Sequence, residues 1–217
     1  MNFLGVLAIW IGTLVGISQG HPMFVLNEAL KVDVWDNEYP CSWTGVYCDW
    51  DNEVTSICLT NLNFTGDLTE GAFPDLPKLE YLSIANTLFL EFPLSIPSDV
   101  CAANSLKHIE IYNFTISSFP SQLSKCTQLE IISLTFTGID GPLPNFSVWP
   151  KLKILELDHN AITGEIPSNL AVLKDLEVVH LFNNKISGSL PTFESSVLRV
   201  LDVRENLLTG EVDVSIT

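Results

Sequence analysis

Residues 152–167 read Leu152-Lys-Ile-Leu155-Glu-Leu157-Asp-His-Asn160-Ala-Ile162-Thr-Gly164-Glu-Ile166-Pro167, and residues 176–191 repeat this pattern with the same spacing. If the first leucine is counted as offset 0, both copies carry apolar residues at offsets 0, 3, 5, 10 and 14. Both also carry asparagine at offset 8 and glycine at offset 12. A phrase that returns with a fixed period of this size predicts a solenoid, in which each coil packs only against its neighbours.

The phrase occurs seven times, at intervals of 22 to 27 residues. The copies begin at Val54, Leu79, Leu106, Leu129, Leu152, Leu176 and Leu198. Each copy opens with a short apolar run that predicts a strand whose offsets 0, 3 and 5 face the core. Asparagine at offset 8 (Asn160, Asn184 and Asn206) suits a tight bend, because its amide can bond backbone groups that the turn leaves unpaired.

Two segments resemble the plant-type leucine-rich repeat proteins: the ending Ile162-Thr-Gly164-Glu-Ile166-Pro167 and the phrase Pro40-Cys41-Ser-Trp43-Thr-Gly45-Val46-Tyr-Cys48. The resemblance covers residues 22–217. It implies an α/β solenoid, a right-handed arc with a parallel sheet on its concave side and a disulfide-bearing N-terminal cap. In that family the two cap cysteines, here Cys41 and Cys48, form a bridge, and tryptophans cover the first strand.

The sequence predicts three parts. Residues 1–20 are apolar and end in small residues that offer a cleavage site, so we predict a signal peptide and a secreted protein. Residues 21–53 do not fit the repeat and are expected to form the cap, with a short helix from Pro22 to about Val32. Residues 54–217 hold the seven repeats, of which the last is incomplete and has no C-terminal cap. No other segment is long and apolar enough to cross a bilayer.

Charge and cysteine content argue against a nucleic-acid partner and against a zinc site. The formal net charge of −16 argues against a nucleic-acid partner, which would require phosphate neutralisation. A secreted chain favours disulfides over metal clusters, and no cysteine spacing matches a zinc site. Cys101 and Cys126 lie one coil apart, and their pairing is left open. Cys58 is predicted to point outward from the first strand, either as a free thiol or as a partner for something outside the chain.

Three N-glycosylation sequons begin at Asn63, Asn113 and Asn145. No sequon follows residue 145, so we expect the concave face of the last three repeats to remain free of glycans.

Offsets 2, 4 and 6 of each predicted strand point away from the core and form three columns across the concave sheet. At offset 2 a run of four aliphatic residues (Ile131, Ile154, Val178 and Val200) is flanked by Phe182. Such an apolar run suggests a protein-binding patch. The alternative is that these side chains only shield one another.

At offset 4, Glu156, His180 and Asp202 are neighbours, and Asp158 lies on the same strand as Glu156. Adjacent carboxylates favour the protonated imidazole, which suggests a pH-sensitive binding site, with a plain solvated face as the alternative. An open curved sheet offers neither a pocket nor an oriented nucleophile, so we expect no catalytic residues, no metal and no cofactor.

We therefore expect a recognition protein, not an enzyme, that binds a protein or peptide partner. The predicted ligand-binding residues are Tyr112, Ile154, Glu156, Asp158, Val178, His180, Phe182, Asp202 and Arg204. Two alternatives stay open: a truncated ectodomain of a membrane receptor-like protein or receptor kinase, and an inhibitor of a secreted cell-wall-degrading glycoside hydrolase. An uncapped last coil also predicts self-association through the C-terminal edge.

Overall fold

The computed structural model describes residues 22–32, 34–35, 39–60, 68, 71, 73, 76–86 and 94–210. The predicted signal peptide, the sequon at Asn63 and the end of the last repeat lie outside these residues. These three predictions therefore stay predictions.

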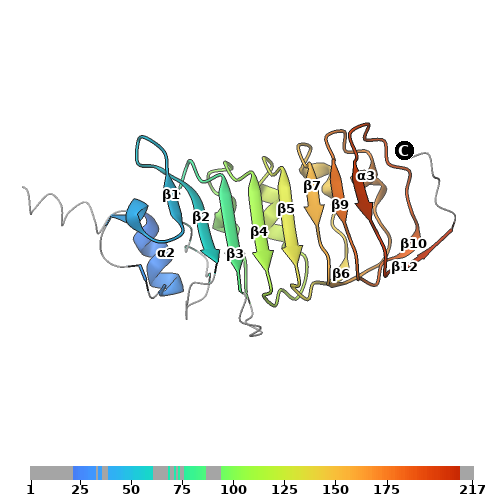
Figure 1. Ribbon diagram of the computed structural model, residues 1–217, viewed down its shortest axis with the longest axis horizontal. Coiled ribbons are helices and arrows are strands. Elements are labelled where there is room, and N and C mark those ends of the chain that lie inside the picture. The colour runs from blue at the N-terminus through green and yellow to red at the C-terminus, as the bar shows by residue number, and fades with distance from the viewer. Residues whose placement is uncertain are drawn as a thin grey trace, which may run out of the picture.

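One sheet of eight strands runs the length of the molecule, and its strands follow one another in chain order (Figure 1). The strands of the repeats are β2 (Val54–Thr60), β3 (Tyr81–Ala85), β4 (His108–Tyr112), β5 (Ile131–Thr135), β7 (Ile154–Glu156), β9 (Val178–His180) and β11 (Val200–Asp202). All pairings among these seven strands are parallel. Each repeat therefore contributes one strand to one row, which confirms the predicted solenoid.

The register places equal offsets of neighbouring repeats opposite each other. Ile131 pairs with Ile154 and Ile154 with Val178, while Leu155 pairs with Val179 on the opposite face of the sheet. The inward offsets 0, 3 and 5 are buried in the first six repeats, as in Leu152, Leu155 and Leu157, and half-buried in the last one. Burial of each such side chain stabilises the fold by roughly 1.5–3 kcal/mol, so the leucine pattern itself sets the register.

The opposite side of the coils carries short helical turns and two small sheets. The turns are η2 (Ser98–Cys101), η3 (Ser121–Lys125), η4 (Phe146–Val148) and α3 (Ser168–Ala171). Two-stranded parallel sheets, not expected from the sequence, join β6 (Asp140–Pro142) to β8 (Ala161–Thr163) and β10 (Ser187–Ser189) to β12 (Leu207–Thr209). They form where the glycine at offset 12 turns the chain with a positive φ, for example 82° at Gly188.

The asparagines at offset 8 fasten each coil to the preceding one. Asn184 is buried; its Oδ1 accepts the N–H of Ile162 at 3.0 Å, and its Nδ2 donates to the carbonyls of Leu157 at 2.9 Å and Leu181 at 3.1 Å. Asn160 and Asn206 make the corresponding bonds in their own coils. The predicted role of offset 8 in the bend is confirmed.

The N-terminal cap closes the first edge of the sheet. It consists of α2 (Pro22–Leu30), η1 (Pro40–Ser42) and β1 (Val46–Cys48), and β1 pairs antiparallel with β2. Trp35 and Trp43 are buried, with ring centroids 5.0 Å apart. Because an unpaired edge strand would recruit other chains, this added strand protects the start of the row.

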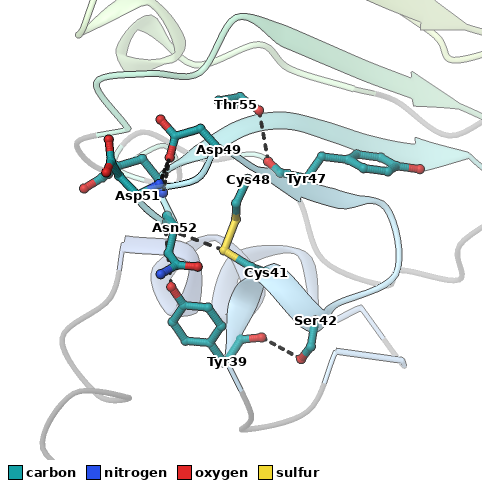
Figure 2. The surroundings of a disulfide bond; sticks show 10 residues. Tyr39, Cys41, Ser42, Tyr47, Cys48, Asp49, Asp51, Asn52 and Thr55 are labelled. Carbon is teal, nitrogen blue, oxygen red and sulfur yellow. Dashed lines mark hydrogen bonds between the residues drawn. A yellow bond between two sulfur atoms is a disulfide. The ribbon is translucent and has the colours of Figure 1, made fainter.

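Two disulfides lie before β5. Cys41–Cys48 ties η1 to β1 (Figure 2), and next to it the Tyr39 hydroxyl donates to the carbonyl of Asn52 at 3.4 Å. The second disulfide joins Cys101, at the end of η2, to Cys126, just after η3. Cys58 is the free cysteine of the described chain and lies half-buried on β2.

Candidate functional site on the concave face

The three predicted columns exist. Strand pairing aligns Glu156 with His180 and His180 with Asp202 at offset 4, and it aligns Tyr112 with Thr135 at offset 6. Eight of the nine predicted residues lie on the three adjacent strands β7, β9 and β11 or just after them. Tyr112 lies on β4, two coils away from β7.

The aliphatic column at offset 2 is only partly covered. Ile131, Ile154 and Val178 are half-buried, and Val200 is exposed. Each side chain shields part of its neighbour, yet together they present a continuous apolar strip beside the charged column. The mutual shielding is therefore visible in the structure, while the role of this column as a protein-binding patch stays a prediction.

A histidine lies between two carboxylates in the middle of the face. The Nδ1 atom of His180 is 3.9 Å from Glu156 Oε1 and 3.8 Å from Asp158 Oδ2. Asp158 Oδ1 accepts the backbone N–H of Phe182 at 2.8 Å, which fixes the direction of its carboxylate. Burial raises the pKa of Asp158 above its usual range, and this effect outweighs the Phe182 hydrogen bond and the attraction of His180. Binding that depends on pH stays a prediction.

One coil further on, an arginine and an aspartate of the same coil pair with each other. The guanidinium of Arg204 donates from Nε to Asp202 Oδ1 at 2.9 Å and from Nη2 to Asp202 Oδ2 at 2.6 Å. Its carbon Cζ lies 5.4 Å from the centre of the Phe182 ring. The hydrogen bond from Arg204 holds the pKa of Asp202 below its usual range. Asp202 is thus neutralised within the molecule, whereas among the described residues the basic side chain within 4.0 Å of both Glu156 and Asp158 is His180.

A row of aromatic rings borders the charged column, and the sequence reasoning found only its two ends. The Tyr112 and Phe136 rings lie 5.6 Å apart, Phe136 stacks on His159 at 4.0 Å, and the Phe182 ring follows at 5.0 Å from His159. We call these four residues the aromatic row. Phe136 and His159 stand at offset 7, one residue beyond the alternating columns. The only signal in the sequence was the large flat side chain at the same offset in two consecutive repeats.

The other edge of the sheet carries alternating charges at offset 1. Lys107 bonds Glu80 at 2.7 Å, and Lys153 bonds Glu130 at 2.6 Å. Arg199 lies 3.6 Å from Glu177 in the same register. These cations are exposed, and each has a carboxylate partner on the preceding coil, so they leave the carboxylates in the middle of the face uncompensated.

A second polar cluster occupies β3 and β4. Both the Tyr81 hydroxyl, at 3.1 Å, and the Ser83 hydroxyl, at 2.9 Å, donate to Glu110 Oε2. The His108 ring lies 4.3 Å from that of Tyr81, and burial lowers the pKa of His108 below its usual range. Glu110 therefore has hydrogen-bond donors from its own face.

Among the described residues, no group of His, Cys, Asp and Glu side chains is arranged to hold a metal ion. In the same part of the chain, no helix has the length and apolar character that spanning a membrane requires. The concave face thus presents hydrogen-bonding, charged and aromatic groups on an open sheet, an arrangement suited to binding a second macromolecule.

Two of the three sequons lie in the described chain. Asn145 is exposed at the start of η4, where its Oδ1 accepts the N–H of Ser147 at 2.9 Å. Asn113 is half-buried, and its Nδ2 donates to the carbonyl of Asn86 at 2.9 Å. Glycosylation at either site stays a prediction, and Asn145 is the more accessible of the two.

Comparison with known proteins agrees with the repeat architecture. Residues 151–173 match the family model described as Leucine Rich Repeat. Pollen receptor-like kinase 2 of Arabidopsis thaliana is 26% identical over 202 residues, a match that covers 80% of this chain and 31% of that protein. The chain thus spans about a third of this relative and matches its repeat region alone, so no kinase activity carries over.

Solved structures of plant receptors superpose on the chain. The PEPR1–AtPEP1 structure has a TM-score of 0.73 and 28% identity, and the match covers 86% of this chain and 28% of that one. The plant peptide hormone receptor RGFR1 in complex with RGF2 has a TM-score of 0.57 and 26% identity, with 63% and 22% covered. With the repeat match and the capped parallel row, these likenesses show a leucine-rich repeat solenoid that resembles the repeat regions of plant receptors.

Proposed function

We propose that this protein is an extracellular recognition module that binds a peptide or protein segment on the concave face of β5, β7, β9 and β11. The observation that carries the proposal is the coincidence of three features on these strands. An apolar strip, two carboxylates without a lysine or arginine partner in the described chain, and the aromatic row lie side by side. The likeness to a peptide hormone receptor solved in complex with RGF2 supports a peptide as the partner.

The relatives also favour one of the two alternatives. Because the chain resembles the repeat regions of much longer receptors, we propose that it acts as the ligand-binding part of a receptor system.

A matched pair of substitutions tests the concave face. Peptides are selected from a display library on the folded chain, and their affinities are then measured for Val178→Asp and for Val172→Asp. Val178 is half-buried in the apolar strip, while Val172 is exposed beside α3 on the opposite side. The two variants carry the same chemical change, so a general loss of stability would affect both.

We expect Val178→Asp to weaken binding by about tenfold or more, because a charge buried at an interface costs more than 1 kcal/mol. Val172→Asp should bind as tightly as the unmodified chain. Peptides that bind all three forms equally would contradict the proposal.

A further inference from the structure

The cations of the described chain are distributed unevenly over the concave side. Those at offset 1 are paired with glutamates, and Arg204 is paired with Asp202. In the described chain, Glu156 and Asp158 have no lysine or arginine within 4.0 Å, and their shared neighbour is His180. Asp158 accepts the backbone N–H of Phe182 through Oδ1, but this bond leaves its Oδ2 and the Glu156 carboxylate without a lysine or arginine partner on an apolar, aromatic face.

The last described coil shows how a carboxylate at this place in the repeat can be neutralised. There, a carboxylate at offset 4, Asp202, holds a guanidinium at offset 6, Arg204, which lies over an aromatic ring of the preceding coil, Phe182. Both parts of the geometry are favourable, since a planar guanidinium bonds a carboxylate through two parallel N–H groups and stacks on aromatic faces.

Two coils earlier the same pattern lacks its cation. Glu156 stands at offset 4, in register with Asp202 through His180. At offset 6, where the later coil has arginine, this coil has Asp158. The preceding coil supplies an aromatic ring at offset 7 instead of offset 6: Phe136, which is 44% exposed and already stacked on His159. The carboxylate and the ring are therefore both present, and a second carboxylate replaces the guanidinium.

We propose that an arginine side chain of the partner occupies this position. Its guanidinium bonds Glu156 and Asp158 and lies against the aromatic row, and the aliphatic side chains that flank it in the partner cover Ile154 and Val178. This assignment rests on the proposed function of the concave face and adds to it the charge and chemistry of the bound segment. An arginine suits the site better than a lysine. The ammonium group of lysine is a point charge that can neither form two parallel hydrogen bonds to a carboxylate nor stack on an aromatic ring.

The test uses the peptides selected from the display library. In each one, arginine is replaced by citrulline, which has the same shape but no charge, and the affinity is measured for the unmodified chain and for a Glu156→Gln/Asp158→Asn variant. Glu177→Gln is the control, because it removes one carboxylate of the same coil as His180 at the opposite edge of the sheet. Circular dichroism confirms that each variant is folded.

We expect citrulline to weaken binding to the unmodified chain by about tenfold or more, as for the loss of a charge-assisted hydrogen bond. The same exchange should have little effect on the double variant, and the control should behave like the unmodified chain. Asp158→Arg reproduces the arrangement of the later coil, so it should exclude the arginine peptides while the chain stays folded.

The outcomes separate this inference from the proposed function. Peptides that need Val178 but bind equally well with arginine or citrulline would overturn the arginine site and leave the concave face as the binding surface. Peptides that bind regardless of Val178 would overturn both.

Discussion

Successive coils bend at offset 7 through a residue with a left-handed backbone. The φ values are 58° at Asn113, 55° at Phe136, 55° at His159, 53° at Asn183 and 52° at Glu205. Asparagine tolerates this conformation, whereas a phenylalanine there costs roughly 1–2 kcal/mol. A strained aromatic residue beside the proposed binding surface suggests that its ring serves binding.

Replacing Phe136 with asparagine tests this interpretation. The change relieves the backbone strain but removes the stacking with His159, which contributes about 0.5–1.5 kcal/mol. We expect the free energy of unfolding to change by less than about 1 kcal/mol, while the affinity for arginine peptides falls several-fold. Urea unfolding and peptide titration measure the two quantities. A strongly destabilised variant, or one with unchanged affinity, would indicate that the ring has only a packing role.

Neutralising Asp158 and neutralising Asp202 should have opposite effects on stability. The folded-state pKa of Asp158 is raised, so its ionised form costs stability at neutral pH, and this cost disappears as the pH falls through that pKa. Asp158→Asn should therefore raise the melting temperature at neutral pH, since an amide oxygen can still accept the Phe182 N–H.

The pKa of Asp202 is lowered by Arg204, so its ionised form adds stability that is lost as the pH falls through its folded pKa. Asp202→Asn should therefore lower the melting temperature at neutral pH and have no effect in acid. Melting temperatures of both variants, measured from neutral to acidic pH, test this expectation. A change of the same sign in both would show that the environments of the two carboxylates do not differ in this way.

At the scale of the coil, the asparagine at offset 8 is the main side chain that hydrogen-bonds one coil to the preceding one. Asn184→Ala would leave the buried N–H of Ile162 and the carbonyls of Leu157 and Leu181 without their partner. We expect a loss of about 2–3 kcal/mol in the free energy of unfolding, because unsatisfied buried groups cost about 1–3 kcal/mol. The exposed neighbour Lys185 serves as the control, and Lys185→Ala should change stability by less than about 0.5 kcal/mol. Equal losses of unfolding free energy in the two variants, measured by urea unfolding, would contradict this role of the asparagine.

The elements that depend on periodicity could be predicted from the sequence, and those that depend on side-chain conformation could not. Offsets 0, 3 and 5 predicted the strands, their core face and their register, because a one-residue slip would expose every leucine. The pairing of Arg204 with Asp202 and the stacking of Phe136 on His159 arise from rotamers and from a left-handed bend, neither of which leaves a periodic signal. The sequence predicts Glu156 and Asp158 as candidate binding residues, but whether a lysine or arginine of the described chain neutralises them depends on side-chain positions that only the structure shows.

For the molecule as a whole, the main asymmetry is that both disulfides lie before β5, in the cap and between the second and third repeats. Cys41–Cys48 and Cys101–Cys126 have sequence separations of 7 and 25 residues. In the described chain beyond Cys126, the coils depend on leucine packing and on the asparagines at offset 8. Because each coil contacts mainly its neighbours, stability in such an array is largely a local property.

Removal of the second disulfide should therefore loosen the coils around β4 and not the whole row. By chain entropy it contributes about 3.5 kcal/mol, against about 2.5 kcal/mol for the bridge in the cap, since the longer loop loses more freedom. We expect the Cys101→Ser/Cys126→Ser variant to lose hydrogen-exchange protection in β3, β4 and β5 and to keep it in β9 and in the bends around Asn184. The concave face of β7 and β9 would then retain its affinity for selected peptides. Uniform loss of protection along the row would mean that the coils unfold as one cooperative unit, because coupling between neighbours would then exceed the stability of any single coil.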